Sequence, residues 1–296
     1  PVLTNKKQLT ETVPFYLIGE SSKEVDITSL FNNNSATATN RKMTVEYTDN
    51  PSWNAVMAMH STINPESDNA IDWSASLYTN MVAQQRASRT PALQSLIRKW
   101  QDEPDSTSTL SSELSKNESL KDILLKESPW VLEAQDETMK KRQPCELFDE
   151  KLLNSRIKEA INHLNDLQYS EGGWSWMRGM KPSYYATLLC VHHLSMLQNY
   201  LTSQNIENDE IDDMLKEGIK FLDKEELDSY KKYYRKHSKY LPSESTINYL
   251  YVKSISKKAN SSSAVKKMTE DYLNRLQKRV TELTMYGPAH VSVILL

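Results

Sequence analysis

Glycine and phenylalanine are scarce in this sequence, with 6 and 4 copies among 296 residues. A β fold with many tight turns uses glycine repeatedly, so this scarcity argues against an all-β protein. The sequence contains instead 15 Tyr, 11 Met and many Leu, Lys, Glu and Ser residues, a composition that suits helices. We therefore predict a mainly α fold.

Positive charge is not in excess, because 36 Lys and Arg residues against 39 Asp and Glu residues leave a formal charge of -3. This balance offers no surplus of cations to neutralise phosphates or anionic lipid, so we expect no nucleic acid partner. No uninterrupted apolar run reaches the ~18 residues that a membrane span needs. We expect no direct membrane insertion of this segment.

Cysteine occurs only twice, at Cys145 and Cys190, without the Cys-x-x-Cys spacing of a zinc ribbon or a thioredoxin-type redox pair. One disulfide and two buried thiols both fit the sequence. The sequence also lacks Gly-x-Ser-x-Gly, His-Glu-x-x-His and a phosphate-cradling glycine loop. We predict no catalytic residue, no metal site and no cofactor.

The first fifty residues differ from the rest of the chain. Residues 13–18 and 43–48 are rich in β-branched and aromatic residues, with turn signals between them, and we predict strands there. Two or three strands do not close a sandwich, so residues 1–50 are expected to complete a β-domain whose other strands lie upstream. The apolar residues 289–296 end without a polar tail, which leads us to expect a fragment of a longer protein.

Beyond residue 51 the apolar spacing becomes helical. The predicted helices are 70–87, 91–101, 149–168, 182–200, 209–222, 224–236, 243–257 and 263–283. Residues 102–148 are expected to form an insertion with short helices. Amphipathic helices alternate with more fully apolar ones, which favours a two-layer α/α-toroid over 51–296. A helical solenoid is the main alternative, although no strict sequence period supports it.

The sharpest local motif is Gln-Tyr-Ser-Glu-Gly-Gly-Trp-Ser-Trp at 168–176. Gly172 or Gly173 can supply a turn with positive φ after the 149–168 helix, and Trp174 and Trp176 can cover the helix end. The spacing from Gln168 to the first Trp resembles the repeat between helix pairs in α/α-toroid proteins, such as triterpene cyclases and complement-like thioester domains. We interpret it as a structural cap and packing plug rather than a ligand platform.

Two further features have simple structural explanations. The acidic run at 207–213 superficially resembles the metal-binding aspartates of terpene synthases, but acidic residues that open a helix explain it better. His192 and His193 are adjacent, so on a helix they point roughly 100° apart and do not form an i, i+4 metal pair. We expect one of them to be buried and hydrogen-bonded.

Several motifs occur in an order that resembles large bacterial alpha-2-macroglobulins. They lie at 9–16, at 43–53, at 120–132 and at 172–176, the last following the helix that begins at Asp149. The similarity covers nearly the whole chain. It implies a macroglobulin- or CUB-like β-domain that ends near residue 50, followed by an α/α-toroid of the thioester-domain type.

The resemblance also points to a reactive site that this chain lacks. In that family the first toroid helix usually begins with Cys-x-Glu-Gln, whose Cys and Gln form a thioester that captures an attacking protease after a bait region is cut. Anchors at Trp53, Tyr78 and Asn80 place Asn69 at the Cys position and Asp72 at the Gln position. An amide and a carboxylate cannot form a thioester, but they approximate a helix capping box.

We therefore expect a non-catalytic, thioester-less fragment of a protein that inhibits proteases by conformational trapping. The resemblance implies a periplasmic or surface-anchored location, with partners in the remaining domains of the parent protein and among proteases. Two alternatives stay open. A toroid-type glycan-processing enzyme needs paired carboxylates in an aromatic cleft, and a plain protein-interaction module needs a large exposed apolar or aromatic patch.

Overall fold

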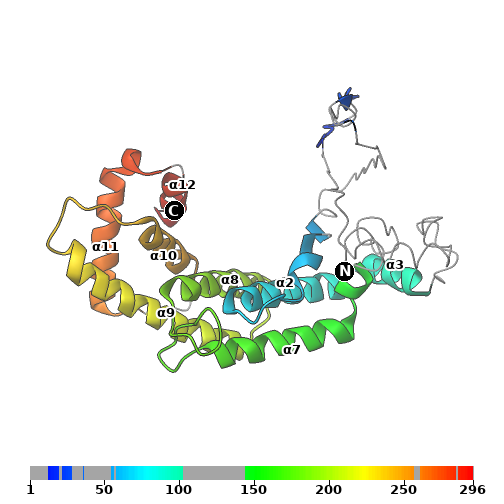
Figure 1. Ribbon diagram of the computed structural model, residues 1–296, viewed down its shortest axis with the longest axis horizontal. Helices are drawn as coiled ribbons and strands as arrows, with labels where there is room; N and C mark the ends of the chain where they lie inside the picture. The colour runs from blue at the N-terminus through cyan, green and yellow to red at the C-terminus, as the bar shows by residue number, and fades with distance from the viewer. Residues whose placement is uncertain are drawn as a thin grey trace.

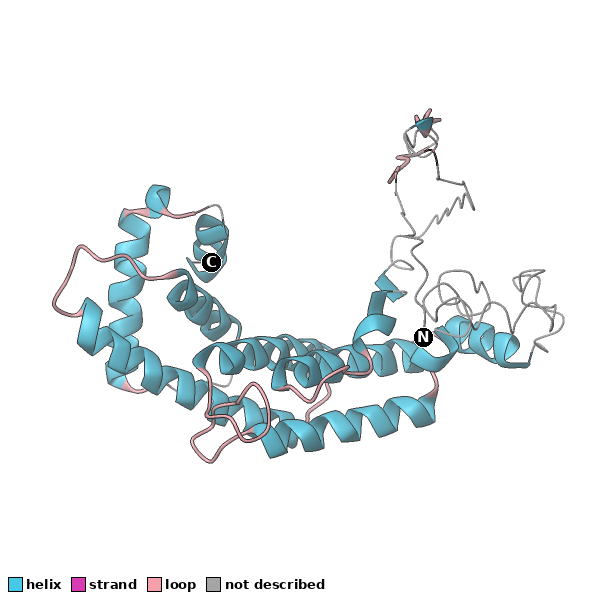
Figure 2. Cartoon of the chain, viewed as in Figure 1, coloured by secondary structure: helices cyan, strands magenta, loops and turns pink. Residues whose placement is uncertain are grey.

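The protein is described by a computed structural model over residues 13–19, 22–28, 36, 55–56, 58–102, 144–256, 261–284 and 286–295. Within these ranges the chain is mainly helical and forms no β-sheet, as Figures 1 and 2 show. The helices are α2 (Ala70–Arg89), α3 (Pro91–Asp102), α7 (Glu150–Leu167), α8 (Tyr184–Ser203), α9 (Asp209–Ser229), α10 (Glu244–Ile255), α11 (Ser263–Lys278) and α12 (Tyr286–Leu295). Two 3-10 turns, η2 (His60–Thr62) and η4 (Val280–Glu282), and a π-helical turn, η3 (Tyr230–Tyr234), complete the list.

Most of these helices begin at a side chain that accepts a hydrogen bond from the backbone N–H three residues later. Such capping satisfies one of the amide groups that the first helical turn leaves without a partner. The capping residues are Asn69, Asp149, Ser183, Asn208, Ser243 and Ser262. The predicted cap at Asp149 is therefore confirmed. The helix expected from residue 182 begins instead after Ser183.

The helices form two layers. In one layer α2 packs against α8, α8 against α10 and α10 against α12, while α7, α9 and α11 lie along the outside of this row. The row curves (Figure 1), but no extensive contact joins α12 to α2 within the described residues. The mainly α prediction is confirmed, whereas closure of the helices into a ring is not observed in this part of the chain.

One large hydrophobic core joins both layers. Leu77, Leu164, Leu194 and Tyr249 are almost completely buried in it, and they come from four different helices. A smaller core joins the C-terminal part of α2 and the N-terminal part of α7 to residues 144–148, which contain the fully buried Leu147. The last residues of the predicted insertion thus belong to the helical domain. Residues 103–143 of that insertion lie outside the described residues.

The boundary predicted between helices 209–222 and 224–236 is wrong, because α9 runs unbroken through residue 223 to Ser229. Asp223 stays in the helix since its carboxylate accepts a hydrogen bond from the Tyr249 hydroxyl at 2.7 Å and pairs with Lys253 on α10. These partners lie beyond the reach of local sequence patterns. The helix predicted over 263–283 also ends early, at Lys278, and continues only as η4.

Residues 13–18 form no strand in the described part of the chain. A strand requires a pairing partner, and the second predicted strand, 43–48, lies outside the described residues. The apolar residues near 290 form α12, which buries Val291 and packs against α10. No described helix is both long enough and apolar enough to cross a membrane.

Candidate functional site

The start of α2 and the loop 168–182 contact each other, although they lie about a hundred residues apart in the sequence. The backbone N–H of Ala70 donates to the carbonyl of Trp176 at 3.3 Å, and Asn69 forms an antiparallel bridge with Met177. The two motifs that the sequence singled out, at 69–72 and at 168–176, therefore form one site.

Asn69 is the N-cap of α2. Its Oδ1 accepts from the Asp72 backbone N–H at 2.8 Å, which confirms the predicted cap. The other half of the capping box is absent, because the Asp72 carboxylate accepts from Asn69 Nδ2 at 2.6 Å and from the Ser67 hydroxyl at 3.0 Å. The Asn69 backbone N–H donates instead to the Ser67 carbonyl at 2.9 Å. Asn69 and Asp72 are thus bonded to each other.

The loop that follows α7 is fixed against α9. Gly172 has φ 91°, and a Cβ there would come within 2.1 Å of the Glu217 carbonyl oxygen, so only glycine fits without a backbone shift. The Gln168 side chain donates to the carbonyls of Gly172 at 3.0 Å and Met214 at 2.9 Å. A Cβ at Gly173 would lie 2.7 Å from the ring of Phe221.

Trp174 is the buried plug that the motif predicted. Its side chain is completely buried, its indole N–H donates to the Leu164 carbonyl at 2.9 Å, and its backbone N–H donates to the Thr187 hydroxyl at 2.8 Å. Gly218 of α9 makes room for the ring, because a Cβ at that position would lie 2.6 Å from it. The plug joins α7, α8 and α9.

Trp176 does not share this role, and our expectation that both rings cover the helix end is wrong. It is 42% exposed and stacks on Tyr185, which is 52% exposed, with ring centroids 5.7 Å apart. Met177 and Met180 of the same loop are also about half exposed. The loop therefore places an aromatic and methionine-rich patch beside the start of α2.

An electrostatic cluster that we did not predict flanks this patch. Asp68 Oδ1 accepts from the Trp73 indole N–H at 2.8 Å and lies 2.9 Å from Nδ1 of His163, whose ring stacks on Trp73 at 4.0 Å. Arg178 approaches Asp68 at 3.9 Å and bonds Asp166 at 3.2 Å. The hydrogen bond from Trp73 lowers the pKa of Asp68, and the charge of His163 adds to this effect.

Cys190 lies against the start of α2. Its sulfur is 3.3 Å from the Ala70 carbonyl oxygen, so in space this cysteine, rather than Cys145, is next to Asn69. No disulfide joins the two cysteines, and of the two buried thiols expected as the alternative only Cys190 is buried, whereas Cys145 is half-buried. Burial raises the pKa of the Cys190 thiol to about 12, and a protonated, completely buried thiol is a poor nucleophile.

His193 is the hydrogen-bonded member of the histidine pair, with Nδ1 2.8 Å from the Ser74 hydroxyl. It is only partly buried, and its ring lies 6.0 Å from that of His192, nearly parallel to it, so the two rings are closer neighbours than we expected. Burial lowers the pKa of His193 to about 4, with a further contribution from His192. His192 in turn contacts Tyr251 edge-on at 5.6 Å.

These two hydrogen-bonded histidines do not complete a catalytic triad. A Ser-His-Asp triad needs the hydroxyl and the carboxylate on opposite nitrogens of one histidine. In the described ranges His163 has the carboxylate of Asp68 but no hydroxyl, and His193 has the hydroxyl of Ser74 but no carboxylate. Ser74 is also completely buried and donates to the Ile71 carbonyl at 2.8 Å.

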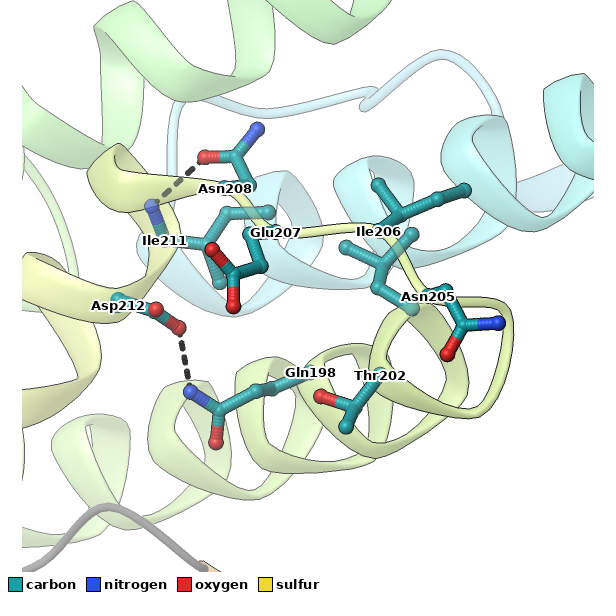
Figure 3. A pocket seen from close by; sticks show the side chains of 9 residues that line it. Gln198, Thr202, Asn205, Ile206, Glu207, Asn208, Ile211 and Asp212 are labelled. Atoms are coloured by element: carbon teal, nitrogen blue, oxygen red, sulfur yellow. Dashed lines mark hydrogen bonds between the residues drawn. The ribbon is translucent and has the colours of Figure 1, made fainter.

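A pocket of about 490 Å³ lies at the turn between α8 and α9 (Figure 3). Two acidic residues, Glu207 and Asp212, line it, and Gln198 donates to Asp212. Asn208 accepts from the Ile211 backbone N–H at 3.0 Å, so this acidic run opens α9 as predicted. No aromatic residue lines the pocket, and no three His, Cys, Asp or Glu residues are arranged to hold a metal among the described residues.

A second pair of acidic residues lies in the core among tyrosines. Glu226 is 4% exposed and accepts from the hydroxyls of Tyr184 at 2.5 Å and Tyr272 at 3.5 Å. Burial raises the pKa of Glu226, although these hydrogen bonds oppose the shift. Asp223, one turn earlier, is held by Tyr249 and Lys253. These contacts tie α9 to α8, α10 and α11.

Comparison of the chain with protein-family models, with curated proteins and with solved structures gave no match.

Proposed function

We propose that this chain is a non-catalytic, thioester-less part of an alpha-2-macroglobulin-like protein that inhibits proteases by conformational trapping. The proposal keeps the toroid interpretation of the helical layers and an extracytoplasmic location, both of which rest on the sequence resemblance. The remaining domains of the parent protein are then the first partners of this chain, and proteases are the targets. The bait region lies outside these residues.

The observation that carries the proposal is the pairing of Asn69 with Asp72. At the two positions where the resemblance expects a reactive Cys and Gln, the side chains cap a helix and bond to each other at 2.6 Å. The thiol that lies near them, on Cys190, is buried and protonated at neutral pH. This site therefore offers no activated acyl group that an amine or hydroxyl of a protease could attack.

The glycan-processing alternative is less well supported. It requires two carboxylates at an accessible aromatic cleft, one of them as acid and the other as base or nucleophile. Glu226 and Asp223 lie among tyrosines, but Glu226 is closed to solvent and the Asp223 side chain is only 13% exposed. Glu207 and Asp212 face a pocket, but no aromatic side chain lines it. Neither pair combines the two properties.

The interaction-module alternative has one specific observation in its favour. The patch made by Trp176, Met177, Met180 and Tyr185 is exposed and contiguous with the start of α2. Exposed patches that combine aromatic residues and methionine are typical of protein interfaces. Under the main proposal the same patch contacts another domain of the parent protein, and Trp176→Ala should weaken that contact. Under the interaction-module alternative, Trp176→Ala should instead weaken binding to a separate partner.

The absence of a thioester is tested with methylamine, which opens thioesters. Intact-mass spectrometry before and after treatment should give the same mass, and a thiol reagent should label no additional cysteine. A discrete adduct that also releases a thiol would show that the assignment of Asn69 and Asp72 is wrong.

Protease inhibition is tested on the parent protein with two substrates of different size. A trapped protease is shielded sterically, so cleavage of a large protein substrate should fall while cleavage of a small peptide continues. The complex should separate from the protease in denaturing detergent, since no covalent bond forms. Equal loss of both activities indicates active-site inhibition, and no loss of either rules out trapping.

A further inference from the structure

A run of cations follows α9, far along the chain from the start of α2. Residues 229–243, here called the cationic segment, contain five Lys and Arg residues and no acidic residue, although the whole chain carries -3. The five are Lys231, Lys232, Arg235, Lys236 and Lys239, and all five side chains are exposed. Like charges repel one another, so such a cluster is favourable only where counter-charge is supplied.

The helix dipole accounts for only part of this cluster. Cations are stabilised near a helix C-terminus, but the effect disappears beyond the last turn, and both α9 and η3 have ended before Lys236. Lys231 also has a partner in Asp228 at 3.3 Å. In contrast, no acidic residue lies within ion-pair distance of Arg235, Lys236 or Lys239 in the part of the chain that the structure describes.

The cationic segment is held in place rather than extended into solvent. Tyr230 and Tyr234 pack edge-on against Tyr272 of α11, at 5.3 and 5.2 Å, and fix the inner side of η3. Arg275 of α11 donates to three main-chain carbonyls of the segment at distances of 2.9 to 3.1 Å. Arg279 donates to a fourth carbonyl at 2.6 Å. A partner therefore meets a preorganised surface, and little ordering is needed on binding.

The exposed tyrosines of the segment indicate what kind of anion it binds. Tyr233 and Tyr240 are 49% and 54% exposed, but Lys232 lies over the Tyr233 ring at 4.9 Å and His237 stacks on Tyr240 at 4.8 Å. One face of each ring is therefore already occupied, which leaves fewer ring faces for stacking on nucleic acid bases. Amphipathic tyrosines beside lysines suit the boundary between lipid and water.

The position of the segment favours a planar partner. The connection from α9 to α10 lies at one end of the long axis of the molecule (Figure 1). The pocket described above is at the opposite end of α9, so it does not belong to this surface. A protruding cationic end can meet a flat anionic surface without a cleft.

We propose that the cationic segment docks the protein onto a membrane surface that contains anionic phospholipids. Each Lys or Arg near such a surface strengthens binding roughly five-fold. Screening confines this attraction to about 8–10 Å at physiological salt, so distant negative charges do not cancel it. The nearby acidic residues Asp228, Asp271 and Glu282 are paired with Lys231, Arg275 and Arg279. The contact is peripheral and requires no insertion of a helix.

The test is co-sedimentation of the whole chain with vesicles, either of phosphatidylcholine alone or of phosphatidylcholine mixed with phosphatidylglycerol. We expect binding only to the mixed vesicles, and weaker binding at high salt. The variant Lys232→Gln/Lys236→Gln/Lys239→Gln should lose affinity by roughly 100-fold. The matched control is Lys216→Gln/Lys220→Gln/Lys224→Gln, which removes three exposed lysines of α9 and changes the net charge equally.

Several outcomes overturn the proposal. Failure of the wild type to bind mixed vesicles does so, as does an equal loss in the two triple variants. Tighter binding to a single-stranded oligonucleotide than to vesicles assigns the surface to nucleic acid, and salt-sensitive self-association in sedimentation assigns it to a second copy. If the test variant melts at a lower temperature, the charge-preserving change of the same lysines to arginine must keep full vesicle binding.

Discussion

At the scale of single residues, Asn69 has a structural role as the N-cap of α2. Its side chain accepts from the Asp72 backbone N–H and so satisfies one otherwise unpaired amide of α2. Asn69→Ala should lower the free energy of unfolding by roughly 0.5–2 kcal/mol, whereas Asn69→Gly should lower it by only a few tenths. Urea denaturation of the two variants measures this difference, and equal losses would contradict the capping role.

Trp174 and Trp176 are two positions apart and have opposite environments. Trp174→Ala removes a fully buried ring and should cost about 3–5 kcal/mol, enough to unfold a marginal domain. Trp176→Ala removes a ring that is 42% exposed and should cost less than about 1 kcal/mol. Thermal denaturation of both variants provides the comparison. A wild-type melting temperature for Trp174→Ala would rule out the plug.

The sequence was sufficient to predict the caps at Asn69 and Asp149, because capping depends on a few neighbouring residues. It could not separate Trp174 from Trp176, since the space for Trp174 comes from Gly218, more than forty residues away. The Asp68 cluster was not predicted either, because Asp68 and its partner His163 lie 95 positions apart. Helix caps formed by neighbouring residues can be predicted from one sequence, whereas contacts between distant segments cannot.

At the scale of helices, the contact between α8 and α2 should be sensitive to acid. The folded-state pKa of His193 is about 4, below the ordinary value of 6.5, so the native state favours neutral His193. The associated stability is fully present above pH 6.5 and is lost as the pH falls from 6.5 to 4. Wild type should lose up to about 3 kcal/mol over this window. His193→Gln should lose much less, as measured by urea denaturation at several pH values.

Glu226, which links α9 to α8 and α11, should change stability with pH in the opposite direction to His193. Burial raises its folded-state pKa above 4.5, so the native state favours the protonated carboxyl. The associated stability is present below pH 4.5 and is lost as the pH rises through the raised pKa. Glu226→Gln should therefore remove a decline in stability toward neutral pH, measured in the same denaturation series. A parallel pH dependence of wild type and this variant would show that folding leaves the pKa of Glu226 unchanged.

Helix boundaries were predictable only where local signals determine them. Ser183 and Ser243 set the starts of α8 and α10 within two residues of the expected positions. The unbroken α9 was missed because contacts of Asp223 with α10 hold it together. The cationic segment can be recognised in the sequence as a stretch with Lys and Arg but no acidic residue. The net charge of the whole chain does not reveal it, because acidic residues elsewhere balance it.

At the scale of the whole molecule, the charge is distributed unevenly. The acidic run at 207–213 opens α9, and the five cations of the cationic segment follow its end. The formal charge of -3 for the whole chain therefore does not reflect the local charge at either end of α9, which is negative at its start and positive after its end. Partners that respond to charge will meet different surfaces at the two ends, within a screening length of about 8–10 Å.

The order of the inner helices has a mechanical consequence. Because α2 packs against α8, α8 against α10 and α10 against α12, without extensive contact between α2 and α12 in the described residues, the helices are coupled in series. Along this row, a displacement at the start of α2 reaches α12 through α8 and α10. A second path runs from Trp174 to Gly218 of α9, whose C-terminal end leads into the cationic segment, so a shift of the loop that contacts α2 is passed to α9 as well as to α8.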